Sequence, residues 1–304
     1  MTPNPKGPKV SVVLPTHNRG HLLRRAIESV LRQTYEDFEL IVVDDASVDD
    51  TEDVVMSIQD PRLKFIQHDV NRGGGAARNT GVQMARGELI AFQDSDDEWF
   101  PSKLKIQTGI MERASAKVGV VYSGFWRVDK ETKSYAPGAK VSRRSGHIHS
   151  DLLRRNFVTT PSILTRKDCL VKVGLFDESL PRLQDWDLVI RLSRDYEFIF
   201  IEEPLLTSYI SPDSISRDDS AVIVALELML TKYHDEFKNA GVLSRHYYSL
   251  CRLLFHDRKY DNGLRYLVNG VRIAPLSIRI PISILFLLPF GRRIYEEAIR
   301  IVGR

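Results

Sequence analysis

The sequence predicts an α/β fold with a mostly parallel central sheet flanked by helices, followed by an all-helical C-terminal region. Short β-branched runs alternate with segments of helical periodicity through the first hundred residues, and the short connections between them favour parallel strands. From about residue 218, helical patterns follow one another without strands between them. We therefore expect an α/β domain over residues 1–217 and a helical region over residues 218–304.

Four apolar runs in the first hundred residues predict strands, and three helical segments lie between them. Leu22 to Leu31 carries apolar residues at helical spacing, and Ser47 to Asp50 can cap a second helix. A third helix is expected to start after Gly73–Gly75. The expected strands of the whole chain are residues 10–14, 38–43, 63–67, 89–92, 119–122, 124–128 and 198–201. Further helices are expected at 152–156, at 166–173 and from 187.

The composition is that of an ordinary globular protein. A net charge of +3 over 304 residues gives no support for nucleic-acid binding. Cys169 and Cys251 lack metal-site spacing, which fits reduced thiols in a cytoplasmic protein. The first ten residues lack the apolar core of a secretory signal. The longest apolar run, residues 280–290, is shorter than the roughly 20 residues that a membrane-spanning helix needs. No internal repeat is evident.

Polar residues follow three of the expected strands at the point where each strand ends. They are Pro15 to Arg19, Asp44–Asp45 and Asp94 to Asp97. Ligands of open α/β sheets bind beyond the carboxyl ends of the strands. We therefore expect the three segments to meet at one edge of the sheet and to form a single site.

The acidic turn is the strongest of these signals. Asp94 and Asp96 can direct carboxylate oxygens at one cation, and Mg²⁺ or Mn²⁺ prefers such ligands, often completed by substrate phosphates. The alternative is a solvated acidic turn.

Three other candidates have an ordinary alternative beside the functional one. Asp44 or Asp45 can accept hydrogen bonds from a nucleobase or a ribose, or simply form a turn. Arg78, near a helix start, can pair with phosphate oxygens, or the glycines before it can serve only as a flexible helix start. Asp185 can act as a general base or cap the helix that follows.

Four blocks in order along residues 9–216 resemble glycosyltransferase family 2. They are VSVVLPTHNRGHLLRRAIESVLRQTYEDFELIVVDDASVDDT, NRGGGAARNTG, ARGELIAFQDSDDEWFP and GLFDESLPRLQDWDLVIRL. The resemblance implies a GT-A fold, a nucleotide-diphosphate-sugar donor, Mn²⁺ or Mg²⁺ as cofactor, and inversion at the anomeric carbon. It also implies a glycan or lipid-linked acceptor, with UDP as the default nucleotide.

The resemblance assigns roles residue by residue. Asp45 is expected to contact the uracil or the ribose, Asp96 to touch the metal most directly with Asp94 as second ligand, and Asp185 to be the catalytic base. The residues expected to bind the nucleotide sugar are Pro15, Thr16, Asn18, Arg19, Asp44, Asp45, Arg78, Asp94, Ser95 and Asp96.

The sequence departs from the family pattern at three places. Gln93 replaces an apolar residue before the acidic turn, and Gln184 replaces the glutamate that precedes the base. After residue 207, where many relatives carry an arginine and a histidine, the run is Ser208 to Ser211. The Gln184 change keeps a catalytically inactive sugar-nucleotide-binding module as an alternative. A nucleotidyltransferase is disfavoured, because Pro15 to Asn18 stands where its glycine-rich loop would lie.

The tail carries the positive charge excess. Residues 271–304 contain six arginines and two glutamates. One interpretation is peripheral contact with the cytoplasmic face of a membrane through residues 271–304. The other is a helical subdomain that packs on the catalytic domain or on a second subunit of a homo-oligomer.

Overall fold

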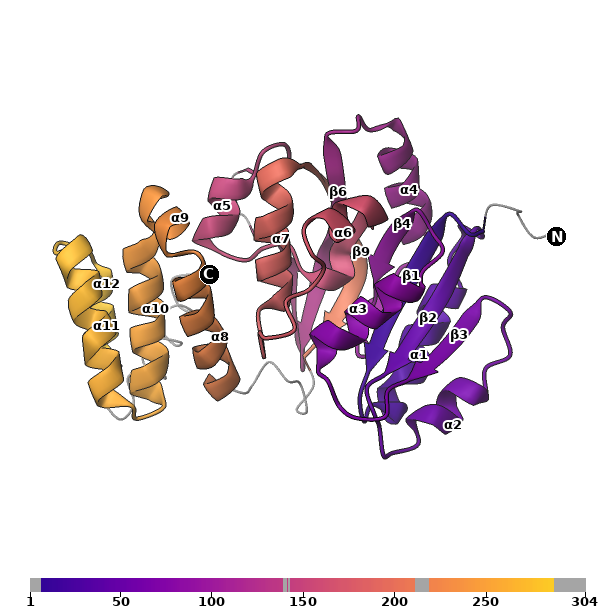
Figure 1. Ribbon diagram of the computed structural model, residues 1–304, viewed down its shortest axis with the longest axis horizontal. Helices are drawn as coiled ribbons and strands as arrows, with labels where there is room; N and C mark the ends of the chain where they lie inside the picture. Colours follow the sequence, from indigo (N-terminus) through magenta and orange to yellow (C-terminus); the bar gives the residue numbers. More distant parts are fainter. Residues whose placement is uncertain (1–6, 139–140, 142, 211–218, 287–304) are drawn as a thin grey trace. The chain divides into compact units, whose positions relative to one another are not determined.

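The computed structural model describes residues 7–138, 141, 143–210 and 219–286 of the chain. These residues belong to two compact units, one holding the sheet with helices α1–α7 and the other holding helices α8–α12 (Figure 1). In the described part of the chain, no helix combines the length and the hydrophobicity needed to cross a bilayer.

One mixed sheet forms the centre of the first unit. Its strands are β1 (Val10–Thr16), β2 (Phe38–Asp44), β3 (Leu63–Gln67), β4 (Leu89–Phe92), β5 (Glu98–Trp99), β6 (Val118–Asp129), β7 (Thr132–Ala136), β8 (Ile163–Arg166) and β9 (Glu197–Tyr209). The strand order is β3-β2-β1-β4-β8-β6-β9-β5, with β7 paired to β6. Strands β3, β2, β1 and β4 are mutually parallel, β8 is antiparallel to both of its neighbours, and β6 pairs with β9 in parallel. The α/β fold predicted from the alternating patterns is confirmed.

Seven helices connect these strands. They are α1 (Gly20–Leu31), α2 (Thr51–Met56), α3 (Gly74–Met84), α4 (Lys103–Arg113), α5 (His149–Arg154), α6 (Lys167–Lys172) and α7 (Gln184–Asp195), with a short 3-10 helix at Thr160–Ser162. The second unit consists of α8 (Asp219–Lys232), α9 (His234–Asn239), α10 (Leu243–His256), α11 (Tyr260–Ile273) and α12 (Arg279–Leu285).

Side chains of β1 alternate between two apolar layers, as strand geometry requires. Val10, Val12 and Leu14 belong to a core cluster that includes residues of α1 and α4. Val13 points to the other face, where α3 crosses the sheet. All four side chains are fully buried. Because β1 is covered on both faces, it can approach a ligand only at its carboxyl end, where the polar segments begin.

The middle of the chain differs from the predicted elements. The expected strand at 198–201 is the first part of the 13-residue β9, and 119–122 with 124–128 form the single strand β6. The pairing of β6 with β9 continues through Gly124 and Pro204 by register shifts, so Glu202–Glu203 does not interrupt the strand. Strand β8 was not predicted, because four residues between a proline-containing turn and a helix carry no periodicity.

Gly81 of α3 should be required for packing on the sheet. A Cβ atom built there would lie 2.3 Å from Cγ1 of Val13, whereas a Cβ atom on Gly109 of α4 would meet nothing within 4 Å. We expect Gly81→Ala to lower the free energy of unfolding by about 1–3 kcal/mol through overpacking. Gly109→Ala should raise it by up to about 1 kcal/mol through helix propensity. Urea unfolding of both variants measures the difference, and equal effects would contradict this packing.

Candidate active site

The carboxyl ends of β1, β2 and β4 lie side by side at one end of the sheet. Thr16 and Asp44 are register partners, and the backbone N–H of Asp45 donates to the Thr16 carbonyl at 2.9 Å. The backbone N–H of Gln93 donates to the Val13 carbonyl at 3.0 Å. The three polar segments singled out in the sequence therefore begin at neighbouring points.

The turn after β1 is tied to the turn after β2. Asn18 has a φ of 50°, its N–H donates to Ser47 Oγ at 2.8 Å, and its Oδ1 accepts the N–H of Val48 at 2.8 Å. Pro15 and Thr16 are buried at the end of β1. Among the described residues, Thr16 Oγ1 has no hydrogen-bond partner. The turn thus holds its shape through hydrogen bonds from backbone N–H groups to side-chain oxygens.

Asp44 and Asp45 are both buried and both engaged by their own chain. Asp44 accepts from Gln67 Nε2 at 3.0 Å and from the N–H and the hydroxyl of Ser47. Asp45 accepts the backbone N–H groups of Arg72 at 2.9 Å and Gly73 at 2.6 Å. Asp44 therefore stabilises the turn after β2, and Asp45 holds the glycine segment that leads into α3. Contact of either carboxylate with the nucleotide stays a prediction.

Arginines surround the acidic turn that follows β4. Arg78 of α3 pairs with Asp94 at 2.7 Å, and Arg19 pairs with Asp96 at 3.2 Å. Arg25 of α1 donates to the backbone carbonyl of Asp96. The structure thus brings together Arg19, Arg78, Asp94 and Asp96, four of the predicted site residues, from segments up to 77 positions apart.

Carboxylates crowd one another in this turn. Burial, followed by the charge of Asp94, raises the pKa of Asp96, and Arg19 opposes the shift. Burial and the charges of Asp94 and Asp96 raise the pKa of Asp97 well above its usual value. The arginines therefore offset only part of the negative charge, and an added cation would be attracted to the turn.

The donor set fits a divalent cation that substrate completes. Asp94 and Asp96 present hard oxygen ligands, and Ser95 between them is half-exposed. In the described residues, no group of three or more His, Cys, Asp and Glu side chains is arranged to enclose a metal ion. Mg²⁺ is commonly held by one or two carboxylates with water and substrate phosphates, so two carboxylates suit this mode better than a closed cage.

Asp185 lies at the start of α7 and is electrostatically linked to the same cluster. Its Oδ2 accepts from the Asn156 amide at 2.9 Å, and its Oδ1 accepts the N–H of Trp186 at 2.8 Å. Burial raises the pKa of Asp185, the two hydrogen bonds and Arg78 oppose the rise, and Asp94 adds to it. A carboxylate held in this way, with a raised pKa, suits a general base.

Several residues that shape the site were not predicted. Asn156 fixes the Asp185 carboxylate, yet the sequence placed it in a helix. The Gln93 amide donates to the Asp97 carbonyl at 2.9 Å. This residue, which departs from the family pattern, therefore stabilises the acidic turn that follows it. Tyr209, in the run that replaces the relatives' arginine and histidine, donates its N–H to Asp97 at 3.3 Å and lies under the Arg25 guanidinium. The contacts of Asn156 and Tyr209 join segments distant in the sequence, so no local pattern predicts them.

Gln184 occupies the position where the family pattern predicts a glutamate. A Cβ atom built on Gly75 would lie 3.5 Å from Gln184 Nε2, which places the amide beside the first turn of α3. The same turn carries Arg78, so the start of α7 and the start of α3 approach each other at the site.

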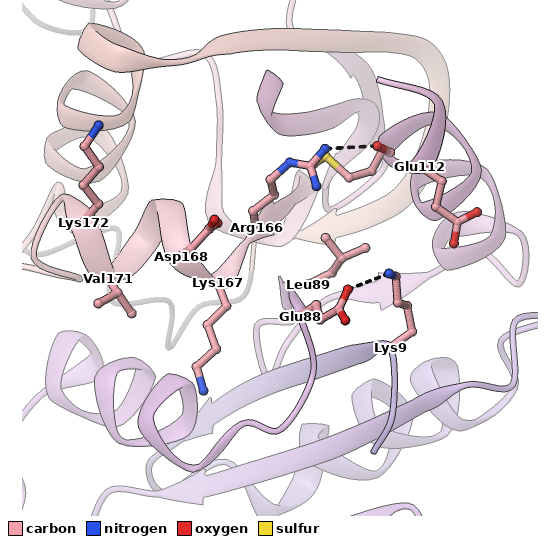
Figure 2. Close-up of a pocket in the computed structure, with 10 residues that line it drawn as sticks. Lys9, Glu88, Leu89, Glu112, Arg166, Lys167, Asp168, Val171 and Lys172 are labelled. Carbon is pink, nitrogen blue, oxygen red and sulfur yellow. Dashed lines mark hydrogen bonds and ion pairs between the residues drawn. The ribbon is translucent and has the colours of Figure 1, made fainter. Parts of the chain in front are cut away.

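A cavity of about 800 Å³ opens at the opposite end of the strands (Figure 2). Lys9 before β1 and Leu89 at the start of β4 line it, together with residues of α4 and α6. Lys9 pairs with Glu88 at 2.7 Å, and Lys167 Nζ donates to the Ala85 carbonyl at 2.6 Å. None of the predicted site residues lines this cavity, so it is separate from the strand tips.

Comparison with known proteins identifies the family. The protein-family model described as "Glycosyl transferase family 2" matches residues 11–174 of this chain. An uncharacterised glycosyltransferase of Rickettsia typhi is 32% identical over 211 residues, which are 68% of this chain and 66% of that protein. WfgD of Escherichia coli, a UDP-Glc:alpha-D-GlcNAc-diphosphoundecaprenol beta-1,3-glucosyltransferase, is 42% identical over 102 residues, 34% of this chain and 40% of WfgD.

Solved structures show the same fold. The mannosyltransferase PcManGT of Pyrobaculum calidifontis, solved with GDP-Man and Mn²⁺, superposes with a TM-score of 0.63 over 96% of this chain and 85% of that one, at 17% sequence identity. The fold is thus the GT-A arrangement expected from the resemblance. With a family model that matches more than half of the sequence, this chain is a member of glycosyltransferase family 2.

Proposed function

We propose that the chain is an inverting, metal-dependent glycosyltransferase of the hexosyltransferase type, which moves a sugar from a UDP-sugar to an acceptor hydroxyl. The observation that carries the proposal is the grouping of Asp94, Asp96, Arg78 and Asp185 at one sheet edge. It provides carboxylates for a cation, arginines for phosphate oxygens, and a separate carboxylate whose pKa is raised.

Asp185 is the base in this proposal. Asn156 and the Trp186 N–H hold its two oxygens in place, and it takes the proton from the acceptor hydroxyl as that oxygen attacks C1 of the donor sugar. A divalent cation bound to Asp94 and Asp96 would neutralise the charge that develops on the departing diphosphate. A single displacement on the face opposite the diphosphate inverts the anomeric centre.

Support for donor and acceptor comes from the relatives. WfgD is named for UDP-Glc and for a lipid-linked diphosphate acceptor, which favours UDP and a glycan or lipid-linked glycan here. PcManGT was solved with GDP-Man, so GDP-sugars belong in any test of the donor. A cytoplasmic location is part of the proposal, because both cysteines are free, buried thiols.

A second candidate is a catalytically inactive module that binds sugar nucleotides. The observation that favours it is Gln184, whose neutral amide stands beside Asp185 where relatives carry a carboxylate. The two candidates share donor binding and differ in turnover.

Donor binding should depend on metal and on Asp96. We expect one class among UDP-, GDP- and dTDP-sugars to bind in Mn²⁺ or Mg²⁺ but not in EDTA, as measured by calorimetry. Asp96→Ala should weaken this binding at least tenfold by removing a hard oxygen ligand. Glu88→Ala is the control, because Glu88 is an exposed carboxylate beside the distant cavity. If no donor binds with either metal, both candidate functions fail.

Asp185→Asn should bind donor normally and lose turnover. Removing a general base typically costs about 10²–10⁴-fold in rate. Asp195→Asn, in the last turn of the same helix, should leave the rate unchanged because Asp195 lies at the surface, where it pairs with Lys172. Transfer assays with the donor identified above measure both variants. A wild-type chain that binds donor but never transfers sugar would favour the inactive module.

The pH dependence of transfer should report the Asn156 contact. A base works only when deprotonated, so the rate falls as the pH falls through the pKa of Asp185. The Asn156 amide lowers that pKa, so Asn156→Ala should raise it and move the acidic limb of the kcat–pH profile to higher pH. Asn156→Asp should move it further by adding a negative charge. An acidic limb that stays in place in both variants would separate Asn156 from the base.

A further inference from the structure

Helices α10 and α11 form a regular hairpin in the C-terminal unit. Each has 14 residues, and three residues, 257–259, join them, with Arg258 at a φ of 59° (Figure 1). The next helix, α12, begins at Arg279 and contacts both helices of the hairpin. In the described part of the unit, the hairpin is therefore followed by one further helix.

The spacing of this hairpin matches the tetratricopeptide repeat pattern of W-x2-L-G-x2-Y, A-x3-F and P within 34 residues. The corresponding residues are Tyr247, Leu250, Cys251, Leu254, Gly263, Leu267 and Pro275. Small residues are needed where the helices cross. A Cβ atom on Gly263 would lie 2.5 Å from the Phe255 ring, and one on Gly270 would lie 2.7 Å from the Tyr248 ring.

No internal repeat was predicted, but the second half of the hairpin has a counterpart later in the sequence. Residues 258–267, RKYDNGLRYL, correspond to residues 293–302, RIYEEAIRIV, at a distance of 35 positions. The second copy lies outside the described residues. A counterpart at this distance fits the period of about 34 residues of tetratricopeptide repeats, and repeat modules bind other molecules on extended surfaces of their stacked helices.

One exposed surface of this hairpin is both apolar and basic. We call it the α11 face, made up of Leu264, Arg265, Val268, Arg272 and Leu276. Leu264 and Val268 are 44% and 47% exposed, and Leu276 in the turn before α12 is 98% exposed. In the part of the chain that the structure describes, no carboxylate pairs with Arg265 or Arg272.

The charge around the α11 face is unbalanced. Residues 243–286 contain seven arginines and lysines and two aspartates, Asp257 and Asp261, and Glu227 of α8 accepts from the Tyr266 hydroxyl of α11 at 3.2 Å. One of the two, Asp257, is already paired with Lys259 at 2.8 Å. The face therefore offers guanidinium groups, which bind carboxylates through two parallel hydrogen bonds, beside apolar side chains that can anchor a ligand.

We propose that the α11 face docks an acidic, partly apolar segment of a partner protein. A lipid surface suits it less well. The side of α11 that carries Gly263 and Gly270 is packed against α10, so the α11 face is a strip along one helix. Lipid-binding clusters usually have about 4–8 basic residues, and the strip has two arginines. A protein segment matches that width.

The test is a peptide selection on the full chain. A phage-displayed random library of 12-residue peptides is selected on the wild type and on Arg265→Glu/Arg272→Glu and Leu264→Ser/Val268→Ser. Lys105→Glu/Arg113→Glu is the matched control, because it reverses two exposed charges on α4 of the other unit. Circular dichroism and urea unfolding show that each variant is folded. Fluorescence anisotropy of the selected peptides gives affinities.

We expect enrichment of peptides that combine Asp or Glu with Leu, Ile or Phe. Their affinity should fall at least tenfold in both α11-face variants, fall with added salt, and stay unchanged in the control. Selection without acidic residues, equal binding to the charge-reversed variant, or no enrichment would overturn the proposal. Flotation with 30% phosphatidylserine vesicles that is lost in Arg265→Glu/Arg272→Glu, without peptide enrichment, would assign the face to a membrane instead. None of these outcomes depends on the catalytic proposal.

Discussion

The candidate-site end of the sheet depends on the compensation of negative charge in the turn after β4. Asp94, Asp96 and Asp97 lie within four positions, and burial makes their mutual repulsion costly. Arg19 and Arg78 approach the first two from opposite sides, since one precedes α1 and the other lies on α3. The positions of these two helices at the strand tips are therefore linked to the charge of the turn, and so is the attraction for a cation.

Carboxylates near the strand tips serve two different purposes. Hydrogen-bond donors of the chain itself engage the carboxylates of both Asp44 and Asp45. These two side chains stabilise the turns, because they replace backbone hydrogen bonds that the turns cannot make. Asp94, Asp96 and Asp185 are held by fewer contacts. Arg78 pairs with Asp94 and lowers the pKa of Asp185, and Arg19 pairs with Asp96. In a family 2 glycosyltransferase, this division of roles allows rigid turns, stabilised by Asp44 and Asp45, to hold the other three carboxylates in place. Supporting contacts of this kind are how an active site keeps its geometry.

The helical unit adds a second kind of surface to the chain. Its hairpin is built on glycines at the helix crossing, and its outer strip combines arginine with leucine and valine. A catalytic α/β unit that selects a small donor has little surface for choosing among large partners. A repeat module supplies such a surface, because stacked helices can vary exposed residues without disturbing the glycine contacts that hold the pair together.

The sequence by itself determined the parallel half of the sheet, the polar strand tips and the family. Strong periodicity in the runs that became β1, β2, β3 and β4 leaves little choice of structure, and parallel strands must end together. Tertiary structure alone decided which carboxylates stabilise the turns and that Asn156 holds the Asp185 carboxylate. It also decided that α10 pairs with α11 at the spacing of a tetratricopeptide repeat. Each of these depends on contacts between segments distant in the chain or on helix bounds, and such contacts leave no local signature in the order of residues.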